Sequence, residues 1–223
     1  MNQKTLVGLV AVVALIVGVV GAIYIAPPTP ENAASAPQTQ PDTDYFSYYP
    51  APRALSEFML TAHTGEPVNN ETLKNQWTLI FLGYTFCPDI CPTTMAELNR
   101  IYPQLQEITS KYPIRVLFIS VDPKRDSIER LAQYVGFFNP DFMAATGEHS
   151  ELFPLARSLG MMYAIAESTD KPDYLVDHSA SVVLVDPDAQ VVGRFKPVLA
   201  PGKLAVADGD HILADMPQIV SSR

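Results

Sequence analysis

The sequence predicts an α/β fold in which helices flank a mixed central sheet. Three short apolar runs lack polar alternation, as is typical of strands covered on both faces: Thr78–Tyr84, Val116–Val121 and Val182–Val185. Segments with helical patterns lie between these runs, and strands that alternate with helices indicate an α/β sandwich. Residues 53–223, which contain all of these segments, have the length of one domain.

The other expected elements follow from signals at their ends. A long helix is expected to begin near Cys91 and to run toward Lys111, with Pro103 kinking or interrupting it. Ser127 is a typical N-cap residue, so a second helix is expected from there to Gly136. A DPDA turn leads into a last strand. That strand and the two remaining helices are expected at residues 191–195, 151–160 and 210–220.

The N-terminal segment Thr5–Ala26 contains 22 residues and no charge. As a helix it would be about 33 Å long, enough to cross the hydrocarbon core of a bilayer. The apolar core of a secretory signal peptide is shorter, about 7–15 residues, and is followed by a small-residue cleavage site. Because the segment is longer and no such site follows, we expect an uncleaved transmembrane helix at residues 5–26.

The flanking charges predict the orientation of this helix. Lys4 precedes it and the next basic residue is Arg53, so residues 1–4 are expected in the cytoplasm and the rest on the far side. A bacterial inner-membrane protein that faces the periplasm, an oxidising compartment, fits this orientation. Residues 27–52 hold seven of the 20 prolines and are expected to form an extended linker to a domain at 53–223. The formal net charge of −9 argues against nucleic acid as a partner.

The only two cysteines, Cys87 and Cys91, lie in one short segment, GYTFCPDICP. This segment directly follows a predicted central strand and opens a predicted helix. Ligand and catalytic groups of open α/β sheets collect at the carboxyl ends of strands, and a helix N-terminus lowers the pKa of a nearby thiol. The location therefore indicates a chemical site.

Three roles are open to this pair of cysteines. As a structural disulfide it would close a loop of only five residues, which removes little chain entropy. As a redox couple it has one residue more than the C-x-x-C of thioredoxin-like proteins, although a disulfide is still feasible. As a metal site it offers two thiolates that positions i and i+4 of a helix direct to one point. Thiolates suit copper(I), and an added imidazole also suits copper(II).

A metal site needs a further ligand, and the four histidines differ in their settings. His63, His149 and His211 lie in segments typical of surface turns and helix starts. His178 lies in a loop that feeds the predicted strand at Val182, and therefore at one end of the sheet. Spacing alone leaves open whether its imidazole reaches the cysteines.

Three longer segments, TFCPDICPTTMAEL, VDPKRDSIERLAQYV and DYLVDHSASVVLVDPDAQVVGRF, resemble the Sco (SenC) family. Its members are membrane-anchored copper proteins with a thioredoxin-like fold, associated with assembly of the binuclear copper site of cytochrome c oxidase. The resemblance spans residues 50–220 and implies copper ligands at Cys87, Cys91 and His178. Asp122 and Asp177 also match family positions, where they are candidates to support the ligands or to face a partner.

The function that the resemblance implies is that of a copper metallochaperone. It would hold Cu(I) or Cu(II) and deliver it to the copper-bearing subunit of cytochrome c oxidase. Other periplasmic copper chaperones or thioredoxin-like reductases are further expected partners. Two alternatives remain: a thiol–disulfide reductase that keeps the recipient's cysteines reduced, with Cys87 and Cys91 as its redox-active pair, and a copper or redox sensor. Copper binding and the disulfide exclude each other, because oxidation removes both sulfur ligands.

Overall fold

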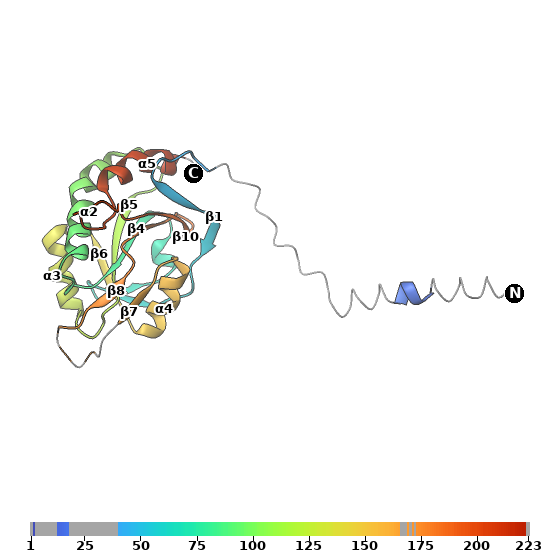
Figure 1. Cartoon of the computed structure of the whole chain (residues 1–223), viewed down its shortest axis with the longest axis horizontal. Coiled ribbons are helices and arrows are strands. Elements are labelled where there is room, and N and C mark those ends of the chain that lie inside the picture. The colour runs from blue at the N-terminus through green and yellow to red at the C-terminus, as the bar shows by residue number, and fades with distance from the viewer. Residues whose placement is uncertain are drawn as a thin grey trace. The chain divides into compact units, whose positions relative to one another are not determined.

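The computed structural model describes residues 2, 13–17, 40–165, 169, 171 and 173–221, and its chain divides into two units, 1–39 and 40–223 (Figure 1). In the first unit, residues 13–17 are helical, and the rest of the predicted transmembrane helix lies outside the described residues. Over the described parts of the chain, no helix combines the length and the apolar character that a membrane crossing requires.

The second unit is built on an eight-stranded sheet. Its central neighbours β4–β5 and β5–β6 pair in parallel and the remaining neighbours pair antiparallel, so the predicted mixed sheet is confirmed. A separate two-stranded sheet is formed by β7 (Tyr163–Ile165) and β8 (Val176–His178). In spatial order, the strands of the large sheet are β1 (Phe46–Ala54), β10 (Gln190–Phe195), β9 (Val182–Val185), β4 (Trp77–Gly83), β5 (Ile114–Ser120), β6 (Met143–Thr146), β2 (Leu60–Ala62) and β3 (Pro67–Val68).

Helices cover both faces of this sheet. In Figure 1, α2 and α3 lie on one side and α4 on the other, while α5 packs against α2. The side chain of Ser127 accepts a hydrogen bond from the Arg130 N–H, as its predicted capping role requires. The helices are η1 (Glu71–Leu73), α2 (Ile90–Glu107), α3 (Ile128–Phe138), α4 (His149–Ser158) and α5 (Gly209–Ser221).

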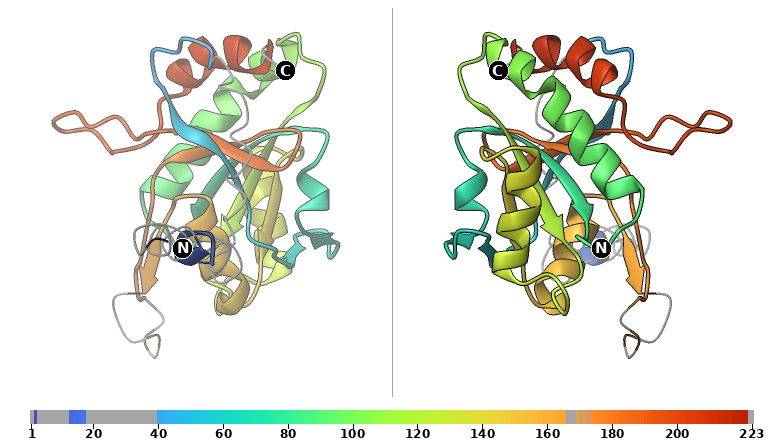
Figure 2. Two further views of the ribbon diagram at one scale, coloured as in Figure 1. Left: turned by 90° about the vertical axis from the view of Figure 1, so that its right-hand side faces the viewer. Right: turned by 90° about the vertical axis from the view of Figure 1, so that its left-hand side faces the viewer.

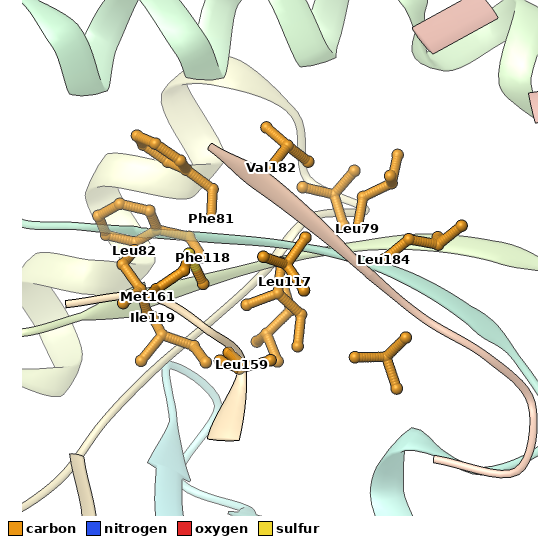
Figure 3. Packing of buried hydrophobic residues seen from close by; sticks show 14 of the residues in the cluster. Leu79, Phe81, Leu82, Leu117, Phe118, Ile119, Leu159, Met161, Val182 and Leu184 are labelled. Carbon is orange, nitrogen blue, oxygen red and sulfur yellow. The ribbon is translucent and has the colours of Figure 1, made fainter. Parts of the chain in front are cut away.

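The core lies between these layers. Every residue of β4 is buried, and Figure 3 shows its side chains packed with those of β5 and β9, among them Phe81, Phe118 and Val182. Continuous burial explains why the sequence of β4 has no polar alternation. The carboxyl end of this central strand leads directly into the segment that carries the cysteines.

The long helix α2 continues through Pro103, which was expected to kink or interrupt it. Proline inside a helix costs about 3 kcal/mol, since it removes one hydrogen bond and crowds the preceding turn. The apolar face of α2 offsets this cost, because Leu98, Ile101 and Leu105 are all fully buried on either side of the proline. The helix ends at Glu107, earlier than the sequence suggests.

The predicted linker, residues 27–52, needs a correction at its C-terminal end, because β1 begins at Phe46. Phe46 and Tyr49 are buried, and β1 pairs antiparallel with β10 at the edge of the sheet. An edge strand tolerates proline, and the pairing register shifts between Tyr48 and Arg53, where two prolines lie. The domain therefore begins before residue 53. Residues 27–39 of the expected linker lie outside the described residues.

Candidate metal centre

The two cysteines lie where β4 passes into α2. Cys87 is in the connecting loop and is partly buried, whereas Cys91 is the second residue of α2 and is fully buried. The backbone N–H of Cys91 donates a hydrogen bond to Cys87 Sγ at 3.4 Å. The first turn of the helix therefore directs a backbone donor at the sulfur of the loop cysteine, and this arrangement favours a thiolate there.

Gly83, the last residue of β4, makes room for the buried sulfur. A Cβ atom at this position would lie 2.6 Å from Cys91 Sγ and 2.7 Å from the ring of Phe118. Neither neighbour can move without disturbing the core, so only glycine fits. The sequence analysis passed over this residue, since its requirement comes from a contact between a strand and a helix.

His178 comes from the other sheet, as the last residue of β8. Its Nε2 lies 3.2 Å from Cys91 Sγ, and its Nδ1 lies 3.3 Å from the carbonyl oxygen of Ser179. When Nδ1–H donates to that carbonyl, Nε2 keeps its lone pair and is free to bind a metal. The rings of Phe81 and Tyr84 meet the imidazole edge-on, with centroids 5.8 and 5.9 Å away.

The sulfur atoms of Cys87 and Cys91 and a ring nitrogen of His178 all lie within 4.8 Å of one another. Ligand atoms around a single metal ion are separated by about 3–4 Å, so small shifts bring all three to one ion. Within the part of the chain that the structure describes, this is the one group of three or more such side chains with that geometry. The structure therefore brings together the three residues that the sequence singled out.

The two thiols differ in acidity. The thiol of Cys91 donates to the sulfur of Cys87 and lowers the pKa of Cys87 to about 3, with help from His178 and the Cys91 N–H against the effect of burial. Burial raises the pKa of Cys91, and the neighbouring Cys87 sulfur raises it further. Without metal, the pair therefore holds one proton, on Cys91. Binding of a soft cation to both sulfurs releases it.

Asp126 positions the start of the cysteine loop. Its carboxylate is buried and accepts hydrogen bonds from the Thr85 N–H at 2.9 Å, the Thr85 hydroxyl at 2.7 Å and the Ser120 hydroxyl at 2.5 Å. Burial raises the pKa of Asp126. The sequence analysis missed this residue, although it lies in the quoted VDPKRD segment; its position just before the Ser127 N-cap was the available signal.

The two aspartates singled out from the sequence have different surroundings. Asp122 is buried and accepts from the Tyr174 hydroxyl and from Arg125 Nε. The guanidinium of Arg125 in turn lies over the Tyr174 ring, and 5.0 Å from the ring centroid of Phe86, the residue before Cys87. Arg125 therefore links Asp122 to the loop that carries Cys87. Asp177 precedes His178 in β8 and is exposed.

The other three histidines make contacts elsewhere. His63 Nδ1 accepts from the Ala144 N–H at 3.1 Å, and His149 Nδ1 lies 2.8 Å from the Tyr163 hydroxyl. His211 stacks on the ring of Tyr45, with centroids 3.6 Å apart. These contacts agree with the surface-turn and helix-start settings expected for them.

A mixed sheet flanked by helices, with two cysteines at a strand-to-helix junction and a histidine beside them, defines a thioredoxin-like protein with a thiolate–imidazole centre. The chain belongs to the SCO1/SenC family, whose model matches residues 47–208. The resemblance noted in the sequence is thus confirmed.

Related sequences and solved structures support the same assignment. A protein of Stutzerimonas stutzeri that is named as a copper-binding protein is 35% identical over 78% of this chain and 80% of its own length. The mitochondrial SCO1 homologue of Homo sapiens is 34% identical over 70% of this chain and 52% of its own, so this chain spans about half of the human relative.

Several similar solved structures contain copper. Arabidopsis thaliana ScoI with copper bound has a TM-score of 0.64 and 30% identity, covering 76% of this chain and 99% of that chain. Yeast Sco1 with copper bound has a TM-score of 0.65 and 28% identity, covering 77% and 91%. The thioredoxin-like fold expected from the resemblance is therefore also that of the solved relatives.

Proposed function

We propose that this protein is a copper metallochaperone of the bacterial inner membrane, which delivers copper to the copper-bearing subunit of cytochrome c oxidase. The observation that carries the proposal is the cluster of Cys87, Cys91 and His178, whose ligand atoms lie within 4.8 Å of one another. Copper in the solved relatives and the copper-binding name of the Stutzerimonas protein support it.

The chemistry of the three ligands suits both oxidation states of copper. Thiolates are soft donors that favour Cu(I), and imidazole extends the range to Cu(II). Two thiolates and a neutral imidazole give the centre a net charge of −1 with Cu(I) and of zero with Cu(II). Three protein ligands leave a position open, through which a cysteine or histidine of a recipient attacks the metal and takes it by ligand exchange.

The experiment that tests this function is metal analysis of residues 40–223 after reduction and loading with excess copper. We expect one copper per chain, and less than about a thousandth of the affinity in Cys91→Ser, because a serine hydroxyl is a hard and weakly acidic replacement for a thiolate. Equal copper affinity in the two proteins, or much less than one copper per chain in the unmodified protein, would disprove the proposal.

The proposed location has its own test. The uncharged segment Thr5–Ala26 and the preceding Lys4 support a membrane-anchored protein whose domain faces the periplasm. We expect the full chain to remain in membranes washed with high salt, and protease added to spheroplasts to digest the domain. Protection of the intact domain would reverse the orientation.

A second candidate is a thiol–disulfide reductase acting on the cysteines of the recipient. The low pKa of Cys87, about 3, and the adjacent Cys91 thiol favour it, because a thiolate next to a second thiol is the arrangement that disulfide exchange uses. The two candidates differ in their need for His178, which only copper binding requires.

A further inference from the structure

Between β10 and α5 the chain forms a finger, residues 196–207, that projects from the body of the domain. Figure 2 shows it as the orange-red ribbon that extends sideways in both views. Pro197 bridges to Ala207 at its base, and the Val198 N–H donates to the carbonyl of Val206 at 2.9 Å. The finger is therefore a defined hairpin.

The tip of the finger is a type II turn. The Lys203 N–H donates to the Ala200 carbonyl at 3.1 Å, with Pro201 and Gly202 as the two central residues. Gly202 has a φ of +74°, which the second central position of this turn requires. Proline restricts the turn further, so the tip is held in one shape before it meets any partner.

The tip presents apolar side chains to solvent. Leu199 is 82% exposed and Leu204 is 46% exposed, although complete burial would stabilise Leu199 by about 1.5–3 kcal/mol and Leu204 by about half as much. Apolar groups gathered on a projecting segment indicate an interaction surface more strongly than scattered ones do.

The charge of the finger contrasts with that of the chain. Residues 196–207 include two lysines, Lys196 and Lys203, and no acidic residue, whereas the whole chain has a formal net charge of −9. An apolar tip with a lysine beside it suits the boundary of a membrane, where leucines enter the acyl region and the lysine amine remains among anionic headgroups.

We propose that the finger inserts Leu199 and Leu204 into the surface of an anionic lipid bilayer, with Lys203 at the headgroups. This rests on the membrane anchor of the proposed function, which keeps the domain within reach of a bilayer. A basic, apolar tip on an acidic protein fits lipid better than it fits a protein recipient, and the experiment below separates the two.

Membrane contact at the finger would also orient the metal centre. One face of the finger borders α2. Val198 and Val206 at its base and Lys203 and Leu204 near its tip line a cavity of about 410 Å³ together with Thr93 and Glu97 of α2. The same helix carries Cys91 in its first turn. A finger held in lipid therefore fixes the direction in which α2, and with it the copper ligands, faces.

The test places a tryptophan at the tip of the finger. Leu199→Trp in the full chain is reconstituted into vesicles of phosphatidylethanolamine and phosphatidylglycerol with or without brominated acyl chains, which quench nearby indoles. The native Trp77 is 1% exposed within β4 and gives a constant background. Phe137→Trp is the matched control, because Phe137 is 83% exposed on α3.

We expect brominated lipid to quench the fluorescence of the Leu199→Trp variant at least twofold more than that of the control, and its emission to shift to the blue. Adding Lys203→Glu should remove about half of that difference in anionic vesicles and leave it unchanged in phosphatidylcholine vesicles. Equal quenching at both positions overturns the proposal and points to a protein partner for the finger.

Two further measurements separate this proposal from the proposed function. Flotation of the vesicles reports the membrane anchor, and copper per chain in the same samples reports the metal centre. If the full chain does not float, residues 40–223 are added to vesicles instead. This part folds by itself in the relatives, since the Arabidopsis structure, 99% of which is covered, matches 76% of this chain. Absence of quenching there also overturns the proposal.

Discussion

The sulfur ligands and the imidazole of the candidate centre are held by different parts of the domain. The cysteines follow the fully buried β4, and Asp126 fixes their loop through three hydrogen bonds from Thr85 and Ser120. His178 ends a three-residue strand of a two-stranded sheet, and its ring is oriented by the Ser179 carbonyl and by aromatic edges. The core therefore positions the sulfurs, whereas the periphery positions the nitrogen.

This difference predicts the order in which the ligands release the metal. The sulfur atom of Cys91 cannot move far without disturbing the packing around it, because Cys91 is 0% exposed. The imidazole of His178 has fewer constraints, so we expect it to be the first ligand that a recipient displaces. Substitutions at His178 and beside the sulfur of Cys91 test this difference, and the largest effect is expected at His178.

Replacing the nitrogen ligand should separate the two oxidation states of copper. In His178→Ala we expect Cu(II) affinity to fall on the order of 100-fold or more, because only thiolates remain, and Cu(I) affinity to fall by less than about tenfold. Competition titrations with chelators specific for each ion measure both values. Oxidase maturation in cells should be lost.

The same variant distinguishes the two proposed activities. A dithiol reductase needs only Cys87 and Cys91, so the rate of disulfide exchange should change by no more than about twofold. His211→Ala is the matched control, since His211 stacks on Tyr45 instead, and it should leave copper binding unchanged. Normal oxidase maturation with His178→Ala would favour the reductase and refute delivery through this ligand.

The sequence predicts the core side of this comparison better than the periphery. The strands around the cysteines are marked by continuous apolar runs, and the N-cap by Ser127, because each signal is local. The place of His178 beside Cys91 depends on how β8, in the separate two-stranded sheet, packs against the cysteine loop. Its predicted location at one end of the large sheet set His178 apart from the other histidines, and the family resemblance identified it as a ligand. Asp126 acts through contacts with Thr85 and Ser120, which lie 41 and 6 residues away along the chain.

The N-terminal edge of the domain was also hidden from sequence patterns. Most of β1 lies within a proline-rich stretch whose composition indicates a linker, and its two prolines sit where the pairing with β10 is interrupted. The buried side chains of Phe46 and Tyr49 compensate for the two missing N–H donors. The proline-rich composition of residues 27–52 predicts a linker, and two apolar residues, Phe46 and Tyr49, are too few to indicate a strand against it.

A smaller effect is expected from crowding the sulfur side. In Gly83→Ala the new methyl would overlap Cys91 Sγ and the Phe118 ring, which costs about 1–3 kcal/mol of stability. We expect Cu(I) affinity to fall about tenfold as the sulfur is displaced, measured by competition titration alongside urea denaturation.

Gly136→Ala provides the matched control for this substitution. Gly136 lies in α3, and a Cβ there meets nothing within 4 Å. Alanine favours a helix by about 1 kcal/mol over glycine, so this variant should be more stable and bind copper normally. Loss of copper in both variants would mean that the affinity does not depend on the room that Gly83 leaves for the Cys91 sulfur.

The smallest effect is expected from changing the pH around the copper-free, reduced protein. The pKa of Cys87 is lowered to about 3, so its thiolate is already formed at pH 5 and further increase in pH adds almost none. The rate of alkylation by iodoacetamide should change less than about twofold from pH 5 to pH 7.5, whereas an ordinary thiol gains about tenfold per pH unit. Mass spectrometry should find the label on Cys87, because Cys91 is buried and keeps its proton.

In Cys91→Ala the main cause of the lowered pKa is gone, the pKa of Cys87 rises, and the alkylation rate should then increase with pH. A rate that climbs with pH in the unmodified protein would show that the Cys91 thiol does not donate to Cys87, and the sulfur pair would then lack the preorganisation that separates it from His178.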